Sequence, residues 1–348
     1  MVRRRTSLLL ALSLILGLTL GLSIAAAEIP DPTGDPSILP AGSKLIPVFT
    51  EGFFLEGPAV GLDGCLYFSD ITFTFGSGMQ AGHIWKYDPR TGKTVIFRSP
   101  SGMSNGIKFD AQGNMIVAEG ADYGGRRITR TDMKTGKAYI VAGLYDGRPF
   151  NGPNDITVDL QGRIYFSDPR YLGHEAVDQP IMGVYRIDPD GSVHLIITDA
   201  GKPNGVCVSP DQKTLYVVCN NNGTTGQHRL PEGAVPQKGQ MALFAYDLAP
   251  DGTAKLREKL VDYYPQDGPD GMICDAEGNL YVAVRDETRP GIYVYSPAGK
   301  ELAYIPTPDL PTNAAWGRGP EIKTLYVTAA KILYKIKMAK NGYQLPSK

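Results

Sequence analysis

The sequence predicts an all-β protein, a six-bladed β-propeller whose ring is closed by an N-terminal strand. Two observations support this prediction. A repeat of about 50 residues occurs six times, and each repeat has the content of four short strands, which is typical of a propeller blade. Outside the first 27 residues, no segment shows the sustained apolar period of a helix. Each repeat starts with a polar residue, here called its leader: Glu56, Asn105, Asn154, Asn204, Asp270 and Asn313.

The first half of each repeat is predicted to be a hairpin. The leader begins an apolar run, a tight turn follows, and a second run rich in Tyr, Val, Ile and Phe completes the pair. A second hairpin follows, with turns such as Asp88-Pro-Arg-Thr-Gly92 between short β runs. Such agreement in register is hard to obtain by chance. In four repeats the first turn carries a glycine at the same distance from the leader: Gly64, Gly113, Gly162 and Gly278.

The last repeat contains only three strands of its own, the third at Ile332–Lys337. We expect the run that begins at Lys44 to supply the fourth strand and to close the ring. The interval between the fourth and fifth leaders is the longest. Its Asn-, Gly- and Pro-rich part, 220–240, is predicted to form a surface loop in blade four. The predicted boundaries are an extended N-terminal tail at residues 28–43, the propeller at 44–338 and a C-terminal tail at 339–348.

Residues 1–27 have the pattern of a secretory signal peptide. Arg3–Arg5 form a positive region, Leu8–Ile24 is apolar, and Ala25–Ala27 fits a cleavage site. We therefore expect a mature chain that begins at Glu28 and is exported to the periplasm or the extracellular space; an uncleaved anchor is the alternative. No other stretch approaches the roughly 18 apolar residues that span a bilayer, so no membrane association is expected after signal removal.

Composition narrows the possible functions. Of 348 residues, 42% are apolar and 20% are charged, which suits a large core and excludes intrinsic disorder. The formal net charge is −1 and no basic cluster follows the signal, so nucleic acid is not an expected partner. Export would permit disulfides. The cysteines are nevertheless widely spaced in apolar runs, and we expect buried free thiols at Cys65, Cys207, Cys219 and Cys274.

The leaders form the candidate site. The first strand of every propeller blade lines the central channel, so residues that begin these strands converge at one mouth. All six leaders carry oxygen, two as carboxylates and four as amides, and such a set suits a hard cation, above all calcium. Zinc would prefer His or Cys, and no histidine is a leader. The alternative is that some leaders, Asn105 and Asn313 first, only cap backbone turns.

At these residues the sequence resembles the gluconolactonase, regucalcin (senescence marker protein) and luciferin-regenerating enzyme family of six-bladed propellers. Among its members the sequence is most similar to the bacterial gluconolactonase-like lactonases. The resemblance extends from about Lys44 to Lys337. The segments that carry it are Ser104-NGIKFDAQGN, Asn151-GPNDITVDLQGRIYFSDPRY, Gly183-VYRIDPDG, Pro203-NG and Pro269-DGM.

The resemblance implies a divalent ion, commonly calcium, on the propeller axis. Its implied protein ligands are Glu56, Asn204 and Asp270, with Asn154 beside the ion, in contact with it or with the substrate. Animal members of the family carry a substrate-binding arginine where this chain has Gly152. The candidate metal ligands are Glu56, Asn154, Asn204 and Asp270, and the candidate substrate-binding residues are Asn105, Asn154, Arg148 and Tyr171.

Two of these substrate assignments extend beyond the family pattern. Arg148 is the candidate to reach the space of the missing arginine. Tyr171 ends the segment that begins at Asp168, which we expect at the mouth of the channel, with an ordinary solvated loop as the alternative.

The resemblance implies a metal-dependent hydrolase of lactones, above all sugar lactones such as gluconolactone, in which the ion polarises the carbonyl. The implied base for the attacking water is Asp270. A carboxylate bound to a dication is a weak base, so a water activated by the ion is the alternative. A second hypothesis is a non-catalytic, calcium-stabilised propeller that binds a sugar or a partner protein. A third is hydrolysis of aryl esters or organophosphates on the same scaffold.

Overall fold

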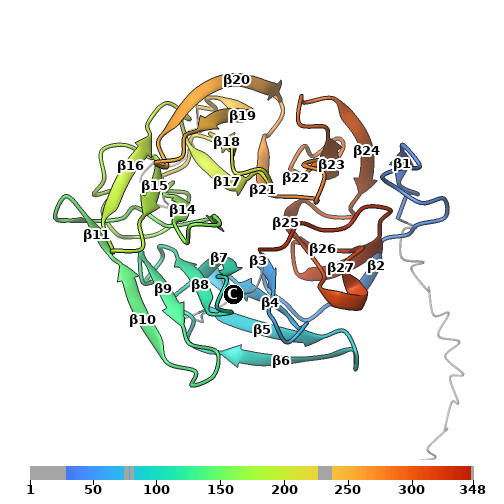
Figure 1. The fold of residues 1–348 in the computed structure, drawn as a ribbon, viewed down its shortest axis with the longest axis horizontal. Helices are drawn as coiled ribbons and strands as arrows, with labels where there is room; N and C mark the ends of the chain where they lie inside the picture. The colour runs from blue at the N-terminus through green and yellow to red at the C-terminus, as the bar shows by residue number, and fades with distance from the viewer. Residues whose placement is uncertain (1–28, 74–77, 79–81, 226–236, 346–348) are drawn as a thin grey trace, which may run out of the picture.

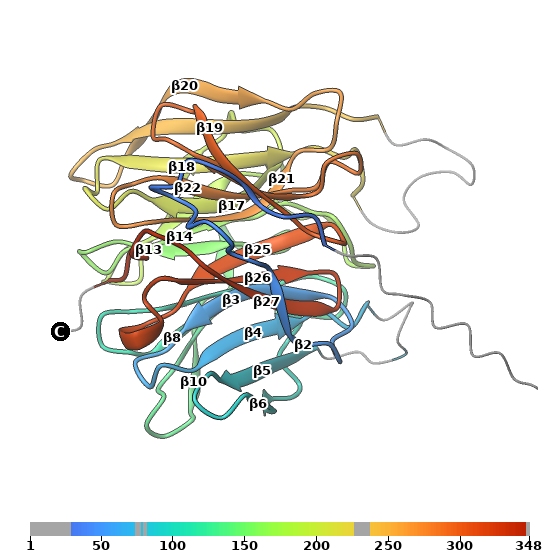
Figure 2. The ribbon, with the colours of Figure 1, turned by 90° about the vertical axis from the view of Figure 1, so that its right-hand side faces the viewer.

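The computed structural model describes residues 29–73, 78, 82–225 and 237–345. Its strands form six antiparallel sheets, arranged as blades around a central axis (Figure 1). The predicted all-β six-bladed propeller is confirmed. Figure 2 shows the blades from the side, with their strands running between two opposite faces of the ring.

The first three blades follow one another along the chain. They consist of β3 (Leu55–Val60), β4 (Leu66–Asp70), β5 (His83–Asp88) and β6 (Lys93–Arg98); β7 (Ser104–Phe109), β8 (Met115–Glu119), β9 (Arg127–Thr131) and β10 (Ala138–Ala142); and β13 (Ile156–Val158), β14 (Ile164–Ser167), β15 (Val184–Ile187) and β16 (Val193–Ile197). A small hairpin, β11 (Leu144–Tyr145) and β12 (Arg148–Pro149), follows blade two.

The other three blades complete the ring. They consist of β17 (Pro203–Val208), β18 (Thr214–Asn220), β19 (Met241–Leu248) and β20 (Ala254–Asp262); β21 (Pro269–Cys274), β22 (Leu280–Val284), β23 (Gly291–Tyr295) and β24 (Glu301–Pro306); and β25 (Pro311–Trp316), β26 (Thr324–Ala329), β27 (Ile332–Lys337) and β2 (Ile46–Phe49). A short 3₁₀ turn, η2 (Gly319–Glu321), lies between β25 and β26. The connection between β18 and β19 lies where the inserted loop was predicted.

An N-terminal strand closes the ring, as predicted. β2 pairs with β27 in blade six, with Ile46 opposite Lys335 and Phe49 opposite Leu333. The Phe49 ring also packs against blade one, with ring centroids 5.6 Å from Phe68 and 5.0 Å from Trp85. The closing strand is therefore fastened to both of its neighbouring blades.

The N-terminal segment at 28–43 was predicted to be an extended tail, and its described part is instead integrated into the fold. β1 (Thr33–Gly34) pairs with β24 and adds a fifth strand to blade five. Ile38 and Leu39 are buried in the apolar cluster of blades five and six. The physical reason is that the edge of β24 offers unpaired backbone groups, while two apolar side chains gain free energy from burial.

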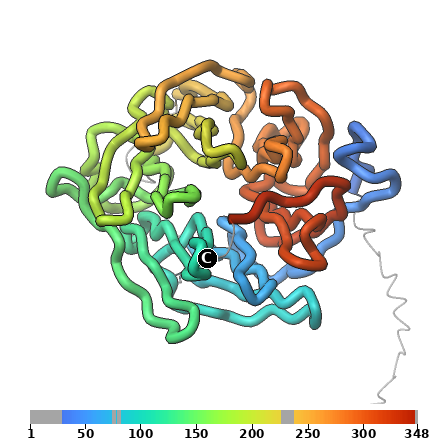
Figure 3. The backbone as a smooth tube through the Cα atoms, in the orientation of Figure 1, coloured from blue at the N-terminus to red at the C-terminus, as the bar shows by residue number. Residues whose placement is uncertain are grey.

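The C-terminal segment at 339–348 is likewise not a free tail over its described residues. Gly342 forms a bridge with Asp275 of blade five. Tyr343 packs on the apolar cluster of blades four and five, and Leu345 packs on that of blades two and three. Figure 3 shows this dark red segment running from blade six toward the centre of the ring.

The inner strands approach one another closely where they begin. A Cβ atom on Gly57 would lie 1.9 Å from the Asn105 carbonyl oxygen, and one on Gly205 would lie 2.6 Å from the Asp270 carbonyl oxygen. Only glycine fits such contacts, which explains why glycine follows the leader in four of the six repeats. The leaders are thus brought together by backbone packing at the axis.

The predicted signal peptide falls on residues 1–27, outside the described part of the chain. Within the described ranges, no helix has the length and apolar character required to cross a membrane.

Candidate functional site

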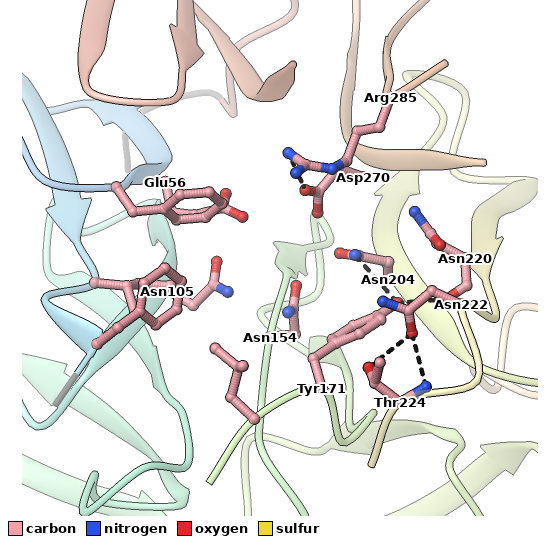
Figure 4. Close-up of a pocket in the computed structure, with 14 residues that line it drawn as sticks. Glu56, Asn105, Asn154, Tyr171, Asn204, Asn220, Asn222, Thr224, Asp270 and Arg285 are labelled. Atoms are coloured by element: carbon pink, nitrogen blue, oxygen red, sulfur yellow. Dashed lines mark hydrogen bonds and ion pairs between the residues drawn. The ribbon is translucent and has the colours of Figure 1, made fainter. Parts of the chain in front are cut away.

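A cavity of 430 Å³ lies at the end of the channel where the inner strands begin (Figure 4). Loops that join the second and third strands of the blades supply most of the rest of its wall, because they return to the same face of the ring. Five of the six leaders line it: Glu56, Asn105, Asn154, Asn204 and Asp270.

The sixth leader, Asn313, serves the backbone instead. Its Oδ1 accepts a hydrogen bond from the N–H of Ala314 at 2.8 Å, and its Nδ2 donates to Asp155 Oδ1 at 3.4 Å. The capping alternative therefore holds for Asn313. It does not hold for Asn105, whose side chain lines the cavity.

Three amide oxygens at this mouth are buried without a hydrogen-bond partner in the described chain, the Oδ1 atoms of Asn105, Asn204 and Asn220. A buried acceptor without a donor costs free energy, so its retention calls for a ligand. Carboxylate and amide oxygens together are the donors that calcium prefers. In the described residues, no three His, Cys, Asp or Glu side chains gather as a metal cluster, and the residues that line the cavity include no histidine or cysteine.

The two carboxylates are nearly inaccessible, with Glu56 only 3% exposed and Asp270 only 7% exposed. Burial raises the pKa of Glu56 well above its usual value, and the nearby Asp270 and Asp155 carboxylates raise it further. Burial also raises the pKa of Asp270 to about 6, against the opposing influence of Arg285 and Asn204. Two buried carboxylates facing one cavity are costly to ionise together unless a cation joins them. The electrostatics of the site therefore fit a divalent ion.

Arg285 is a site residue that the sequence prediction missed. Its Nη1 lies 3.4 Å from Asp270 Oδ2 and donates to the Pro311 carbonyl at 3.2 Å. Its guanidinium lies over the Phe54 ring, 5.8 Å from the centroid. Arg285 provides positive charge beside Asp270. It directly follows the second strand of its blade, as Ile71 does in blade one, and this shared position was the signal from which the sequence could have predicted it.

Asp155 is the second residue that was missed. It stands directly after its leader, where four other repeats have glycine, and that departure was the available signal. Its carboxylate is 1% exposed and accepts from the Val206 N–H at 3.1 Å and from Asn313. Burial raises its pKa. It adds a third acidic group behind the two leaders.

Tyr171 lines the cavity, in agreement with its assignment to the channel mouth. Its hydroxyl donates to the Asn220 carbonyl at 2.9 Å and accepts from Asn204 Nδ2 at 3.3 Å. Behind its ring, Lys202 Nζ lies 4.0 Å from the centroid and donates to Asn222 Oδ1 at 2.8 Å. These contacts fix the polar wall formed by the loop after β18.

Arg148 is not where it was expected. It lies exposed in β12, on the hairpin that follows blade two, and it is not among the residues that line the cavity. The physical reason is that this hairpin is held by the Gln179 side chain, which donates to the Arg148 carbonyl at 2.9 Å and to that of Tyr145. The cationic group near the cavity is Arg285 instead.

Fold and site together define a six-bladed propeller with a buried oxygen-donor site at one mouth of its channel. A family model described as the SMP-30/Gluconolactonase/LRE-like region matches residues 55–331. A gluconolactonase of Zymomonas mobilis is 30% identical over 299 residues, which cover 79% of this chain and 78% of the relative. The chain therefore belongs to the SMP-30/gluconolactonase/LRE-like family.

Solved structures agree with this assignment. A gluconolactonase of Xanthomonas campestris is similar with a TM-score of 0.72 and 25% identity, over 89% of this chain and 95% of that one. A regucalcin of Agrobacterium tumefaciens, described as a calcium-binding protein, has a TM-score of 0.66 and 19% identity, over 87% of this chain and 96% of that one. The second likeness concerns the fold alone.

Proposed function

We propose that this protein is a divalent-metal-dependent lactone hydrolase, with calcium as its ion and sugar lactones such as gluconolactone as its substrates. The observation that carries the proposal is the pairing of two buried carboxylates, Glu56 and Asp270, with unpartnered amide oxygens around one cavity. The names of the relatives, gluconolactonase and lactonase, support the reaction class.

Glu56, Asn154, Asn204 and Asp270 would hold the ion. When bound, it would polarise the lactone carbonyl and stabilise negative charge on its oxygen during attack by water. The amide of Asn105, at the same mouth, would orient the substrate by hydrogen bonding.

Asp270 would act as the proton carrier. Its carboxylate accepts a proton from the water that attacks the carbonyl carbon, and then returns it to the ring oxygen when the ester bond breaks, which yields the open hydroxy acid. Arg285 at 3.4 Å favours the charged, proton-accepting form of Asp270. Burial acts in the opposite direction and keeps this carboxylate more basic than an exposed one.

The cavity has two kinds of wall. Asn220, Asn222 and Thr224 offer polar groups for ring hydroxyls, while apolar side chains such as Phe54 and Leu172 also line the cavity. A compact lactone with several hydroxyls fits a pocket of 430 Å³ lined in this way.

The test is a panel of lactones assayed in a pH-stat, with calcium and with a chelator, together with elemental analysis of gently purified protein. We expect one divalent ion per chain and acid release from sugar lactones that chelation abolishes. Zinc held by histidine, or hydrolysis that is indifferent to chelation, would contradict the metal assignment. Absence of lactone hydrolysis at every calcium level would favour the non-catalytic binder.

We also propose that the protein is exported to the periplasm or the extracellular space. The support is the Arg3–Arg5, Leu8–Ile24 and Ala25–Ala27 pattern. N-terminal sequencing of the protein from its native host should give Glu28 as the first residue. An intact Met1 would contradict cleavage.

A further inference from the structure

The opposite end of the channel holds a second, smaller cavity of 80 Å³. It is lined mostly by inner-strand residues that stand three or four positions after the leaders, about 10 Å farther along each strand. The C-terminal residues Tyr343, Gln344 and Leu345 lie over it and form its outer wall. We call it the lower chamber. None of its residues takes part in the reaction proposed above.

Two cysteines face each other in the lower chamber across the interface of blades four and five. Cys207 of β17 is 5% exposed and Cys274 of β21 is 1% exposed, and both belong to the same apolar cluster. The two Sγ atoms donate to one acceptor, the Val208 carbonyl, at 3.7 Å and 3.8 Å. These two distances place the sulfurs at most 7.5 Å apart, and each thiol directly affects the ionisation of the other.

The register of the strands explains this placement. Side chains alternate between the two faces of a strand. Cys207 stands third after its leader and points to the following blade, whereas Cys274 stands fourth after its leader and points to the preceding one. The other two cysteines belong to other apolar clusters, Cys65 with blades one and two and Cys219 with blades three and four.

We infer that Cys207 and Cys274 form an oxidisable pair, whose disulfide joins the inner strands of blades four and five. The oxidant that suits a chamber of this size is a small hydroperoxide, and hydrogen peroxide is the simplest one. The resulting bond would cross-link the two strands that also carry Asn204 and Asp270. It would therefore hold the spacing of two site residues at the other end of the same strands.

The chemistry balances with one equivalent of hydrogen peroxide. The Cys207 thiolate attacks one peroxide oxygen, the O–O bond breaks, and hydroxide leaves with the displaced electron pair. The Cys274 sulfur then attacks the sulfenic acid sulfur of Cys207, the S–O bond breaks, and the second oxygen leaves as water. Both thiol protons end in water. Two thiols are oxidised to one disulfide and the peroxide is reduced to two water molecules.

The environment favours Cys207 as the attacking sulfur. Its interaction with Cys274 lowers the pKa of the Cys207 thiol, and Lys108 lowers it further. The same pair interaction and burial raise the pKa of Cys274 well above its usual value. Since the thiolate is the nucleophile, Cys207 is expected to react first and Cys274 to resolve the intermediate.

The experiment uses the reduced, folded full-length chain. It is exposed to a small excess of hydrogen peroxide, quenched with catalase, alkylated in denaturant and mapped by peptide mass spectrometry. We expect a linked peptide that contains Cys207 and Cys274, alkylated Cys65 and Cys219, and an upward shift in Tm that a reductant reverses. Four alkylated cysteines, or a link to Cys65 or Cys219, would overturn the inference.

Matched variants separate the pair from the remaining thiols. The double variant Cys65→Ala and Cys219→Ala should form the same link, and it keeps both inferred partners in place. Cys274→Ala should stop at a sulfenic acid on Cys207 that dimedone traps. If the double variant loses the peroxide-dependent Tm shift, the inference is also overturned, because the shift would then arise from the other cysteines.

Discussion

The two ends of the channel are built from the same six inner strands, yet they differ in what they bury. At the leader end, burial raises the pKa of the Glu56 and Asp270 carboxyl groups, because nearby positive charge does not fully offset the loss of water. The Oδ1 atoms of Asn105 and Asn204 have no hydrogen-bond partner in the described chain. At the lower end, side chains pack on one another and the C-terminal segment covers them. The leader end therefore lowers the stability of the ligand-free protein in order to bind a ligand, whereas the lower end stabilises the fold by packing.

This difference shows how a repeat can carry function without changing its fold. In four of the six repeats, glycine after the leader allows the close approach of neighbouring inner strands, so the leader side chain itself is free to serve chemistry. Residues three and four positions after the leader face neighbouring blades and are constrained by the packing between blades. Substitutions at the two ends should consequently have separable effects on activity and on stability.

The largest expected effect is at the leader end. Asp270→Asn keeps size and one oxygen but removes charge and basicity, so lactone hydrolysis should fall by roughly 10²–10⁴-fold if Asp270 is the proton carrier. Calcium affinity should weaken too, because one of two negative ligands is lost. The measurement is kcat across a calcium titration. A variant that regains full activity at saturating calcium would show that Asp270 is only a ligand.

At the lower end, stability should change while activity does not. Combined replacement of Tyr343 and Leu345 by alanine removes the apolar cover of the lower chamber and should cost about 2–4 kcal/mol of unfolding free energy. Chemical denaturation measures the loss, and kcat should stay near that of the wild type. Lys340→Ala is the matched control, since its pair with exposed Glu277 is worth little. A large drop in kcat would contradict the separation of the two ends.

Without metal, the leader end should make the stability of the protein decrease as the pH rises from 5 to 7. The pKa of Asp270 rises from 3.8 to about 6 on folding, so between these values the native state binds more protons than the unfolded state. Without metal, this group therefore makes the protein more stable at pH 5 than at pH 7, by about 1 kcal/mol. Saturating calcium should reverse the trend, because protons compete with the ion.

Thermal unfolding at both pH values, with calcium or chelator, checks this expectation. Asp270→Asn removes the group and serves as the control, because its difference between the two pH values should be smaller. An identical pH response of the chelated wild type and the variant would contradict the assignment.

The sequence predicted the features that repeat and missed those that do not. Blade number, closure by β2 and convergence of the leaders follow from a fixed register and were predictable. Arg285 was missed because the side chain directly after the second strand differs in chemistry from blade to blade, as Ile71 after β4 and Arg285 after β22 show, so no residue pattern marks this position. The terminal segments were expected to be tails because two paired residues at Thr33–Gly34, or one bridge at Gly342, leave no periodic signal. Arg148 was wrongly expected at the cavity because its closeness in sequence to Gly152 does not determine the direction in which the β11–β12 hairpin carries its side chain.

The smallest predicted effect concerns Asp155, the residue in which the repeat itself departs from glycine. Its negative charge contributes to raising the pKa of both Glu56 and Asp270. Asp155→Asn removes that repulsion and keeps an oxygen for the Val206 N–H, so calcium binding should persist to lower pH, with a shift of about 0.5–1 pH unit.

Calcium titrations between pH 5 and 7 measure the shift. The new amide must sit beside donors that served a carboxylate, so unfolding free energy should fall by about 1 kcal/mol. Asn313→Ala is the matched control: it removes one contact of the Asp155 carboxylate at 3.4 Å and keeps the charge. The control should lose stability without moving the pH dependence of calcium binding to lower values. If both variants shift it equally, Asp155 acts through packing at the axis, and its charge has no part in tuning the site.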